Sequence, residues 1–202
     1  MTYKFFLDKR PHNALTYQEY MNQFIEEVEN PPVDFKSEED RKRYEHKKLN
    51  LQRSKRIEKY FSPSDELRQA VSKITEPQLW MMITESWCGD SAQNIPYFAK
   101  TAELNPLINF RIILRDTNAD IMDNFLTNGT RSIPKLVVFN ESGDVLFDWG
   151  PRPKPALNLF RELKEKGLEK KQILDELHLW YGRNKGQAVQ KEIIGLLNRF
   201  IK

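Results

Sequence analysis

An uninterrupted apolar run in the middle of the chain constrains the fold most strongly. The residues Leu79-Trp80-Met81-Met82-Ile83 predict a strand over residues 78–84 that is buried on both faces. A helical pattern opens near Ser91, so the strand leads into a helix and the chain reads as α/β. Cys88, the only cysteine among 202 residues, lies between the two.

The position of Cys88 makes it a candidate nucleophile. At the N-terminus of a helix, free backbone N–H groups and the helix dipole favour a thiolate, so we expect a lowered pKa. The competing interpretation is an inert, half-buried cysteine, because free cysteine is among the most buried residue types. The residues around Cys88 indicate whether it is a nucleophile or an inert cysteine.

Those residues resemble a known active site. Trp87-Cys88-Gly89-Asp90-Ser91 is similar to the Trp-Cys-Gly-x-Cys motif of the thioredoxin family, with Ser91 in place of the second cysteine. Pro96 stands where thioredoxins carry a kink-forming proline, and Ser132-Ile133-Pro134 resembles their cis-proline loop. The resemblance covers residues 76–166. It implies a thioredoxin-like three-layer fold, in which a central mixed sheet has flanking helices.

The remaining elements of this region follow from their patterns. A second strand is predicted at 109–114, and a short helix around 121–126 that Asn128-Gly129 would close. Strands at 135–139 and 145–149 would form a hairpin, with Ser142-Gly143 in the turn.

The resemblance also implies roles for the site residues. Cys88 would attack, and Ser91 would either donate its hydroxyl to the thiolate or simply cap the helix. Trp87 would shield the rim of the site. Pro134 would be cis, leaving the backbone N–H and C=O of Ile133 to an extended peptide. The residues expected to contact substrate are Trp87, Gly89, Asp90, Ile133 and Pro134.

Two positions depart from the thioredoxin pattern. Asp90 stands where thioredoxins often carry proline, and its charge opposes thiolate formation. Met82 stands six residues before Cys88, where thioredoxins commonly bury an aspartate that serves proton transfer to the second thiol. Glu85 would replace that proton acceptor, or would be a solvated residue of the rim.

A single cysteine limits the chemistry. Cys88 can form a mixed disulfide, but another thiol must resolve it, either a low-molecular-weight thiol such as glutathione or a protein. The expected partners are therefore protein thiols or disulfides, or a low-molecular-weight thiol. The alternative is a redox-inactive binding module that uses a groove beside Pro134. The sequence leaves the oligomeric state open, including a Cys88–Cys88 disulfide between two copies.

No cofactor or metal is expected. His12, His46 and His178 share no metal-ligand spacing with Cys88. The chain has no phosphate-binding glycine loop. It also lacks a Gly-Gly-x-Asp-Asp-like glutathione motif, which argues against the iron–sulfur chemistry of monothiol glutaredoxins.

Helices are expected on both sides of the thioredoxin-like part. Thr16 to Glu19 has the form of a capping box, and Asn30-Pro31-Pro32 ends that helix. A second helix begins at Ser37 and a third at Ser62-Pro63-Ser64, with Pro63 in its first turn. The division is a helical N-terminal extension packed on the core (1–75), a thioredoxin-like domain (76–166) and C-terminal helices (167–202).

Charge and hydropathy limit the partners and the location. The helix after Ser37 is rich in Lys and Arg, which suits either an anionic partner or a solvated face. The net charge of +3 is too small to imply nucleic acid, so none is expected. No apolar stretch approaches the length of a membrane span, and the N-terminus lacks an apolar signal core. We therefore expect a cytoplasmic protein that does not bind membranes.

Overall fold

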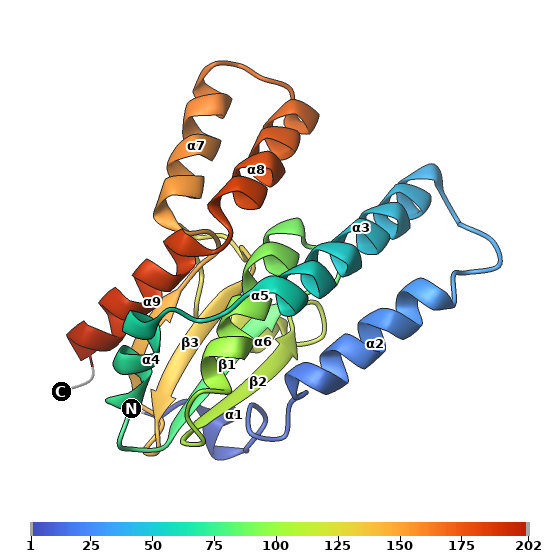
Figure 1. Ribbon diagram of the computed structural model, residues 1–202. Coiled ribbons are helices and arrows are strands. Elements are labelled where there is room, and N and C mark those ends of the chain that lie inside the picture. Colours follow the sequence, from blue (N-terminus) through green and yellow to red (C-terminus); the bar gives the residue numbers. More distant parts are fainter. Residues whose placement is uncertain (1, 201–202) are drawn as a thin grey trace.

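A computed structural model describes residues 2–200 (Figure 1). Its centre is a four-stranded sheet in the order β2-β1-β3-β4. The strands are β1 (Gln78–Thr84), β2 (Ile108–Leu114), β3 (Lys135–Asn140) and β4 (Val145–Trp149). β1 is parallel to β2 and antiparallel to β3, which pairs antiparallel with β4. This mixed sheet with helices on both faces confirms the predicted fold class.

Helices precede and follow the strands and also form connections within the sheet. They are α1 (Lys4–Leu7), α2 (Tyr17–Glu29), α3 (Glu38–Tyr60), α4 (Asp65–Ser72), α5 (Gly89–Ala102), α6 (Ala119–Met122), α7 (Lys154–Glu165), α8 (Lys170–Asn184) and α9 (Gln187–Phe200).

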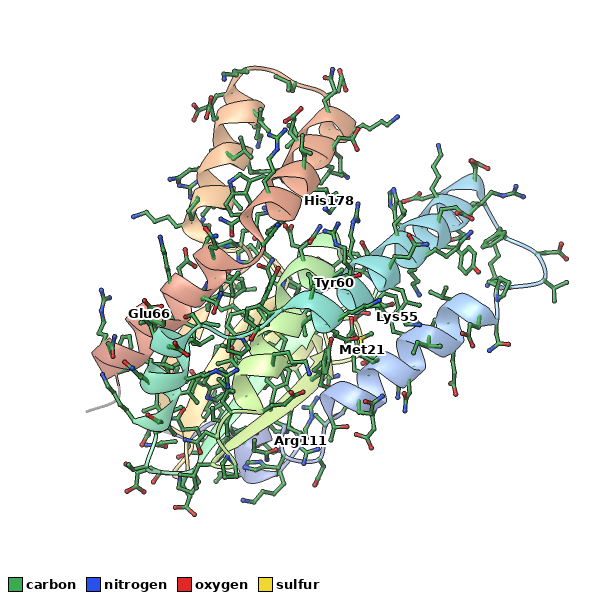
Figure 2. All side chains as sticks on the ribbon, viewed as in Figure 1. Met21, Lys55, Tyr60, Glu66, Arg111 and His178 are labelled. Atoms are coloured by element: carbon green, nitrogen blue, oxygen red, sulfur yellow. The ribbon has the colours of Figure 1, made fainter. Side chains whose placement is uncertain are left out.

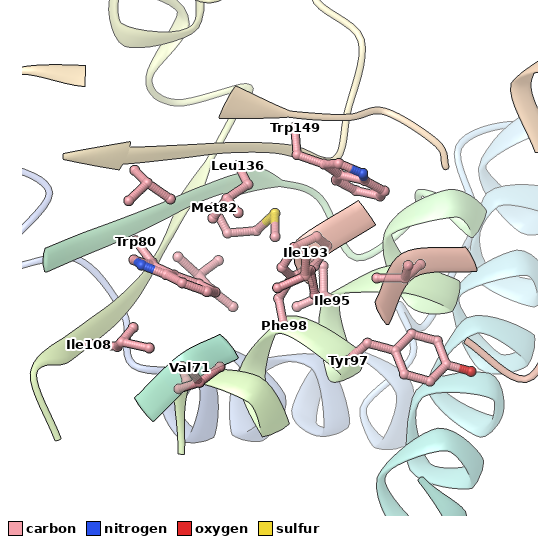
Figure 3. Packing of buried hydrophobic residues seen from close by; sticks show 14 of the residues in the cluster. Val71, Trp80, Met82, Ile95, Tyr97, Phe98, Ile108, Leu136, Trp149 and Ile193 are labelled. Carbon is pink, nitrogen blue, oxygen red and sulfur yellow. The ribbon is translucent and has the colours of Figure 1, made fainter. Parts of the chain in front are cut away.

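The central strand β1 is buried along its whole length, as its apolar run predicts. Because side chains alternate along a strand, its residues enter two different cores. Trp80 and Met82 join a large cluster with residues of α2, α3, α4, α5 and α9, part of which Figure 3 shows around Phe98 and Ile193. Leu79, Met81 and Ile83 enter a cluster on the opposite face, with residues of α1 and α6.

Local signals place most helix starts correctly. Thr16 and Glu19 form the predicted capping box at α2, and Ser37 caps α3 by accepting from Asp40 N at 3.0 Å. One start differs: Ser64 caps α4, so Pro63 precedes the helix and does not lie in its first turn.

Two further details differ from the sequence reading. The helix around Ile121 ends at Met122, and Asn128-Gly129 instead forms a turn, with backbone hydrogen bonds joining Thr127 and Thr130. The short helix α1 has no counterpart in the predictions, although its Phe5 and Phe6 are buried beneath the sheet.

The first turn of α5 lies between two pairs of helices (Figure 1). On one side are α2 and α3, and α3 packs along α5. On the other side, α7 and α8 form a helical hairpin with its own small core, which includes Leu163, Ile173 and Leu177. Both additions to the sheet therefore reach the strand–helix junction that carries Cys88. No helix within residues 2–200 has the length and apolar character that a bilayer span requires.

Candidate functional site

Cys88 stands at the point where β1 gives way to α5. It is the N-cap of α5, with extended backbone angles, and its side chain makes no cap hydrogen bond. The side chain is half-buried, and with Trp87 it packs against the apolar cluster under the sheet. Pro96 lies inside α5, at the place expected from the resemblance. The only cysteine of the chain therefore lies, partly exposed, at the start of a helix.

The loop that ends in Pro134 faces this sulfur. The Ile133–Pro134 peptide bond is cis, as the resemblance implies. Cys88 Sγ lies 3.4 Å from the carbonyl oxygen of Ile133 and donates a hydrogen bond to it. The structure thus brings together Cys88, Ile133 and Pro134, although 45 positions separate Cys88 from Ile133.

The pKa of Cys88 is shifted in the direction opposite to the expected one. Burial, together with the negative charge of Asp90, raises the pKa of the Cys88 thiol to about 11. Hydrogen bonds from the backbone N–H groups of Asp90 and Ser91 favour the thiolate, but their effect is smaller. The expectation of a lowered pKa was therefore wrong, because loss of solvation outweighs the helix N-terminus.

Ser91 lies in the first turn of α5 and is fully buried. It is not the cap of the helix, since Cys88 holds that position. Within residues 2–200 its Oγ makes no hydrogen bond of regular geometry, yet its closeness to the sulfur lowers the pKa of Cys88. The capping role is therefore wrong, and the donation of the Ser91 hydroxyl to the thiolate stays a prediction.

Asp90 is held by two residues that the sequence did not single out. Arg152 makes a two-pronged ion pair with its carboxylate, with Nη2–Oδ2 at 2.6 Å and Nε–Oδ1 at 2.9 Å. Tyr181 of α8 donates its hydroxyl to Oδ1 at 2.8 Å. Burial raises the pKa of Asp90, while Arg152 and Tyr181 act to lower it.

A signal for Tyr181 did exist in the sequence. Tyr181 belongs to an apolar stripe at helical spacing, which consists of Ile173, Leu174, Leu177, Trp180 and Tyr181. A phenol hydroxyl in such a stripe needs a polar partner once it is buried. For Arg152, which follows Gly150-Pro151, no local pattern indicates a partner.

Gly89 and Ser86 contact the added helices. A Cβ at Gly89 would lie 2.9 Å from Cε1 of His178 on α8, whose position Figure 2 shows. On the other side, Asn50 of α3 donates to the carbonyl oxygen of Ser86 at 3.2 Å. The Ser86 hydroxyl donates to Glu27 of α2 at 2.6 Å. Helices before and after the sheet therefore fix the loop that carries Cys88.

Trp87 and Glu85 face the loop after β2. The guanidinium of Arg115 lies 4.8 Å from the centre of the Trp87 ring, a cation–π geometry. The carboxylate of Glu85 accepts a hydrogen bond from Asp116 N at 2.7 Å, and burial raises its pKa. Met82 is fully buried, so the position six residues before Cys88 holds a thioether within the core.

Two cavities lie away from the thiol. One, of about 450 Å³, lies between α2 and α3, lined in part by Phe35 and Tyr44. The other, of about 510 Å³, lies beside β2 and is lined in part by Arg10 and Asn118. Neither has Cys88 or Pro134 in its wall. Within residues 2–200, no three His, Cys, Asp or Glu side chains are grouped to hold a metal ion.

Comparisons with solved structures and with a family model show what the chain is similar to. The chain resembles the crystal structure of a protein of unknown function from Pseudomonas aeruginosa, at 17% identity and a TM-score of 0.55, over 92% of this chain and 98% of that one. An HIV epitope-scaffold matches at 17% identity and a TM-score of 0.55, over 91% of this chain and 98% of that one. These two likenesses show the fold alone.

No curated protein sequence matches. A sequence model described as Thioredoxin matches residues 36–164, more than half of the chain. The chain therefore belongs to the thioredoxin family.

Proposed function

We propose that this protein carries out thiol–disulfide exchange through Cys88 alone. The observation that supports it most directly is the 3.4 Å contact between Cys88 Sγ and the carbonyl oxygen of the residue before cis-Pro134. The Cys88 residue is partly exposed, so an extended disulfide-bearing segment can approach it beside the loop that ends in Pro134. Protein disulfides and low-molecular-weight disulfides are the substrate classes that fit this chemistry.

The reaction takes place in two balanced steps. Cys88 loses its proton to solvent, and the thiolate attacks one sulfur of a substrate disulfide. A new S–S bond to Cys88 forms, and the other half of the substrate leaves as a thiolate. An external thiol then attacks the mixed disulfide, which returns Cys88 to the thiolate and leaves a new disulfide in solution.

The raised pKa sets the rate of the first step. With a pKa of about 11, only about one thiol in ten thousand is ionised at pH 7. The rare thiolate is intrinsically more nucleophilic, which recovers part of the loss. The exchange is therefore slow near neutral pH and accelerates steeply in alkaline solution.

Mass spectrometry of the intact protein tests the proposal. Wild-type protein is incubated with glutathione disulfide at pH 7 and at pH 10, alongside the variant Cys88→Ala. We expect one glutathionyl adduct on the wild type, formed faster at pH 10 and removed by added glutathione, and none on the variant. If the wild type forms no adduct at either pH, exchange through Cys88 is ruled out.

The raised pKa also favours a second candidate, a binding module without redox chemistry. A thiol that stays protonated, with Met82 where dithiol thioredoxins bury an aspartate, can serve as a neutral hydrogen-bond donor beside Pro134. The substitution Cys88→Ser keeps a donor and removes the sulfur chemistry. Binding or cellular function that survives in Cys88→Ser and fails in Cys88→Ala would support the module, whereas loss in both would support exchange.

A further inference from the structure

Asp90, two residues after Cys88, has partners at both oxygens of its carboxylate. Its side chain is 12% exposed and that of Arg152 is 16% exposed, so their ion pair lies largely out of water. Oδ1 accepts from Arg152 Nε and from the Tyr181 hydroxyl, while Oδ2 pairs with Arg152 Nη2. An ion pair with this two-pronged geometry holds both partners in one orientation.

The groups that hold Asp90 come from the C-terminal part of the chain. Arg152 follows β4, and its guanidinium lies 4.5 Å from the centre of the Phe160 ring on α7. Tyr181 is a buried residue of α8. Asn94, one turn further along α5, donates both to the Tyr181 hydroxyl at 3.2 Å and to the carbonyl oxygen of Asp90 at 2.7 Å. A closed polar network thus joins the start of α5 to the α7–α8 hairpin.

A second contact with the hairpin lies one residue closer to the sulfur. The ring of His178 packs against Gly89, where any larger side chain would meet it. Its Nδ1 lies 3.3 Å from Gln93 Nε2 on the next turn of α5. The two residues that directly follow Cys88 are therefore both held by α8.

We propose that Asp90 is a positioning residue of the thiol site, through which the C-terminal hairpin fixes the first turn of α5 and limits the reactivity of Cys88. The inference rests on the proposed function only in taking Cys88 as the reacting group. The carboxylate of Asp90 acts on the sulfur through its charge. Arg152 and Tyr181 hold that charge at a fixed place.

The charged and titratable groups around the site show whether Asp90 favours or disfavours ionisation of the Cys88 thiol. They are Tyr20 of α2, Arg53 of α3, Arg152, and His178 and Tyr181 of α8. Burial raises the pKa of Tyr20 and of Tyr181, so both phenols stay neutral. Burial and the nearby Arg53 lower the pKa of His178 to about 4, so this ring is also neutral at pH 7.

Asp90 is therefore the carboxylate that disfavours the thiolate, and Arg152 offsets part of its charge. The substitution Asp90→Asn removes the negative charge and leaves Arg152 without its counter-ion. Both changes favour the thiolate of Cys88.

The decisive experiment measures the rate of Cys88 alkylation by iodoacetamide against pH. In Asp90→Asn, which keeps an acceptor for Tyr181, we expect the midpoint of the profile to fall, by about one pH unit. The rate at pH 7 should then rise about threefold or more, since part of the gain in thiolate is lost in nucleophilicity. The matched control is Asp123→Asn, which breaks the ion pair of Asp123 with Arg131 and should leave the profile unchanged.

A purely structural Asp90 would lower the melting temperature and leave the alkylation profile where it is, which would overturn the proposal. The variant Tyr181→Phe keeps every charge and removes one hydrogen bond to Asp90. Here we expect faster amide hydrogen exchange both in α8 and over residues 89–94. Exchange that stays at the wild-type rate over residues 89–94 would contradict the coupling, even if Asp90→Asn failed to fold.

Alkylation involves no disulfide, so this experiment is independent of the exchange reaction. A shifted profile in a protein that forms no glutathionyl adduct would support the positioning role of Asp90 and exclude exchange. A glutathionyl adduct on the wild type, together with an unshifted alkylation profile in Asp90→Asn, would support exchange through Cys88 and exclude the positioning role of Asp90.

Discussion

Cys88 Sγ lies 3.4 Å from the carbonyl oxygen of Ile133, so the one thiol of the chain points at the loop that ends in cis-Pro134. That oxygen is an acceptor for the protonated thiol and would repel a thiolate. An incoming peptide that donates to the Ile133 carbonyl would share the oxygen that accepts this hydrogen bond. The protonation state of the sulfur therefore governs its contact with this loop.

The first prediction concerns the reactivity of the wild-type thiol. Because burial and Asp90 raise the pKa of Cys88 to about 11, its alkylation rate should climb throughout the range from pH 7 to pH 11. Stopped-flow or mass-spectrometric measurement with iodoacetamide checks this. A plateau below pH 9 would show that the thiol is less desolvated than its surroundings indicate.

Alkaline stability should depend on the same group. The folded pKa of Cys88, about 11, lies above the unfolded value near 9.0, so the folded state favours the neutral thiol. That contribution is complete below pH 9 and is lost as the pH rises through 11. The loss should be on the order of 2 kcal/mol in the free energy of unfolding. Urea unfolding of wild type and Cys88→Ala at pH 8 and pH 11 should show it as a difference, and parallel losses would contradict it.

Acid stability should depend on His178. Burial lowers the pKa of His178 to about 4 from an ordinary 6.5, so the folded state favours the neutral ring. Its contribution is present above pH 6.5 and is lost as the pH falls through 4. We expect the free energy of unfolding to decline over this window by on the order of 1–2 kcal/mol more in wild type than in His178→Gln. Equal declines in the two proteins would mean that other groups carry the acid sensitivity.

The packing of His178 on Gly89 predicts a coupled pair of substitutions. Gly89→Ala places a Cβ 2.9 Å from the His178 ring, which should cost about 1–2 kcal/mol of stability. With His178→Ala in the background the clash disappears, and Gly89→Ala should become neutral or stabilising, because alanine favours the helix. Thermal melts of the two single variants and the double variant check this sign change. If the two effects simply add, the contact does not bear on stability.

Gly150 should tolerate no side chain. Its φ is +128°, and a Cβ would lie 2.1 Å from the backbone oxygen of Pro134. Gly150→Ala should therefore cost well over about 2 kcal/mol, since backbone is harder to displace than a side chain. The control is Gly195→Ala on α9, where nothing lies within 4 Å and a gain of about 0.5–1 kcal/mol is expected. Chemical unfolding of both variants measures the contrast, and a mild effect at Gly150 would contradict it.

Local sequence determined the secondary structure well. The apolar run of β1 allows one interpretation, because such a strand must be covered on both faces, and the boundaries of β1 agree with the prediction. The caps Thr16 and Ser37 hold their own first turns, so their effect is visible within four residues. The cis bond before Pro134 followed from the family resemblance, and no local pattern predicted the cis bond between Gly150 and Pro151.

Only the tertiary structure determined the direction in which the pKa of Cys88 is shifted. The sequence placed Cys88 at a helix N-terminus, which by itself favours the thiolate, but its pKa depends on how many neighbouring atoms exclude water. The partners of Asp90 lie 62 and 91 positions away, at Arg152 and Tyr181, and no spacing rule reaches that far. Short-range hydrogen bonding and hydrophobic periodicity are properties of consecutive residues, so the sequence determines them. Desolvation and ion pairing depend on which distant segments fold against each other, and so they exist only in the folded chain.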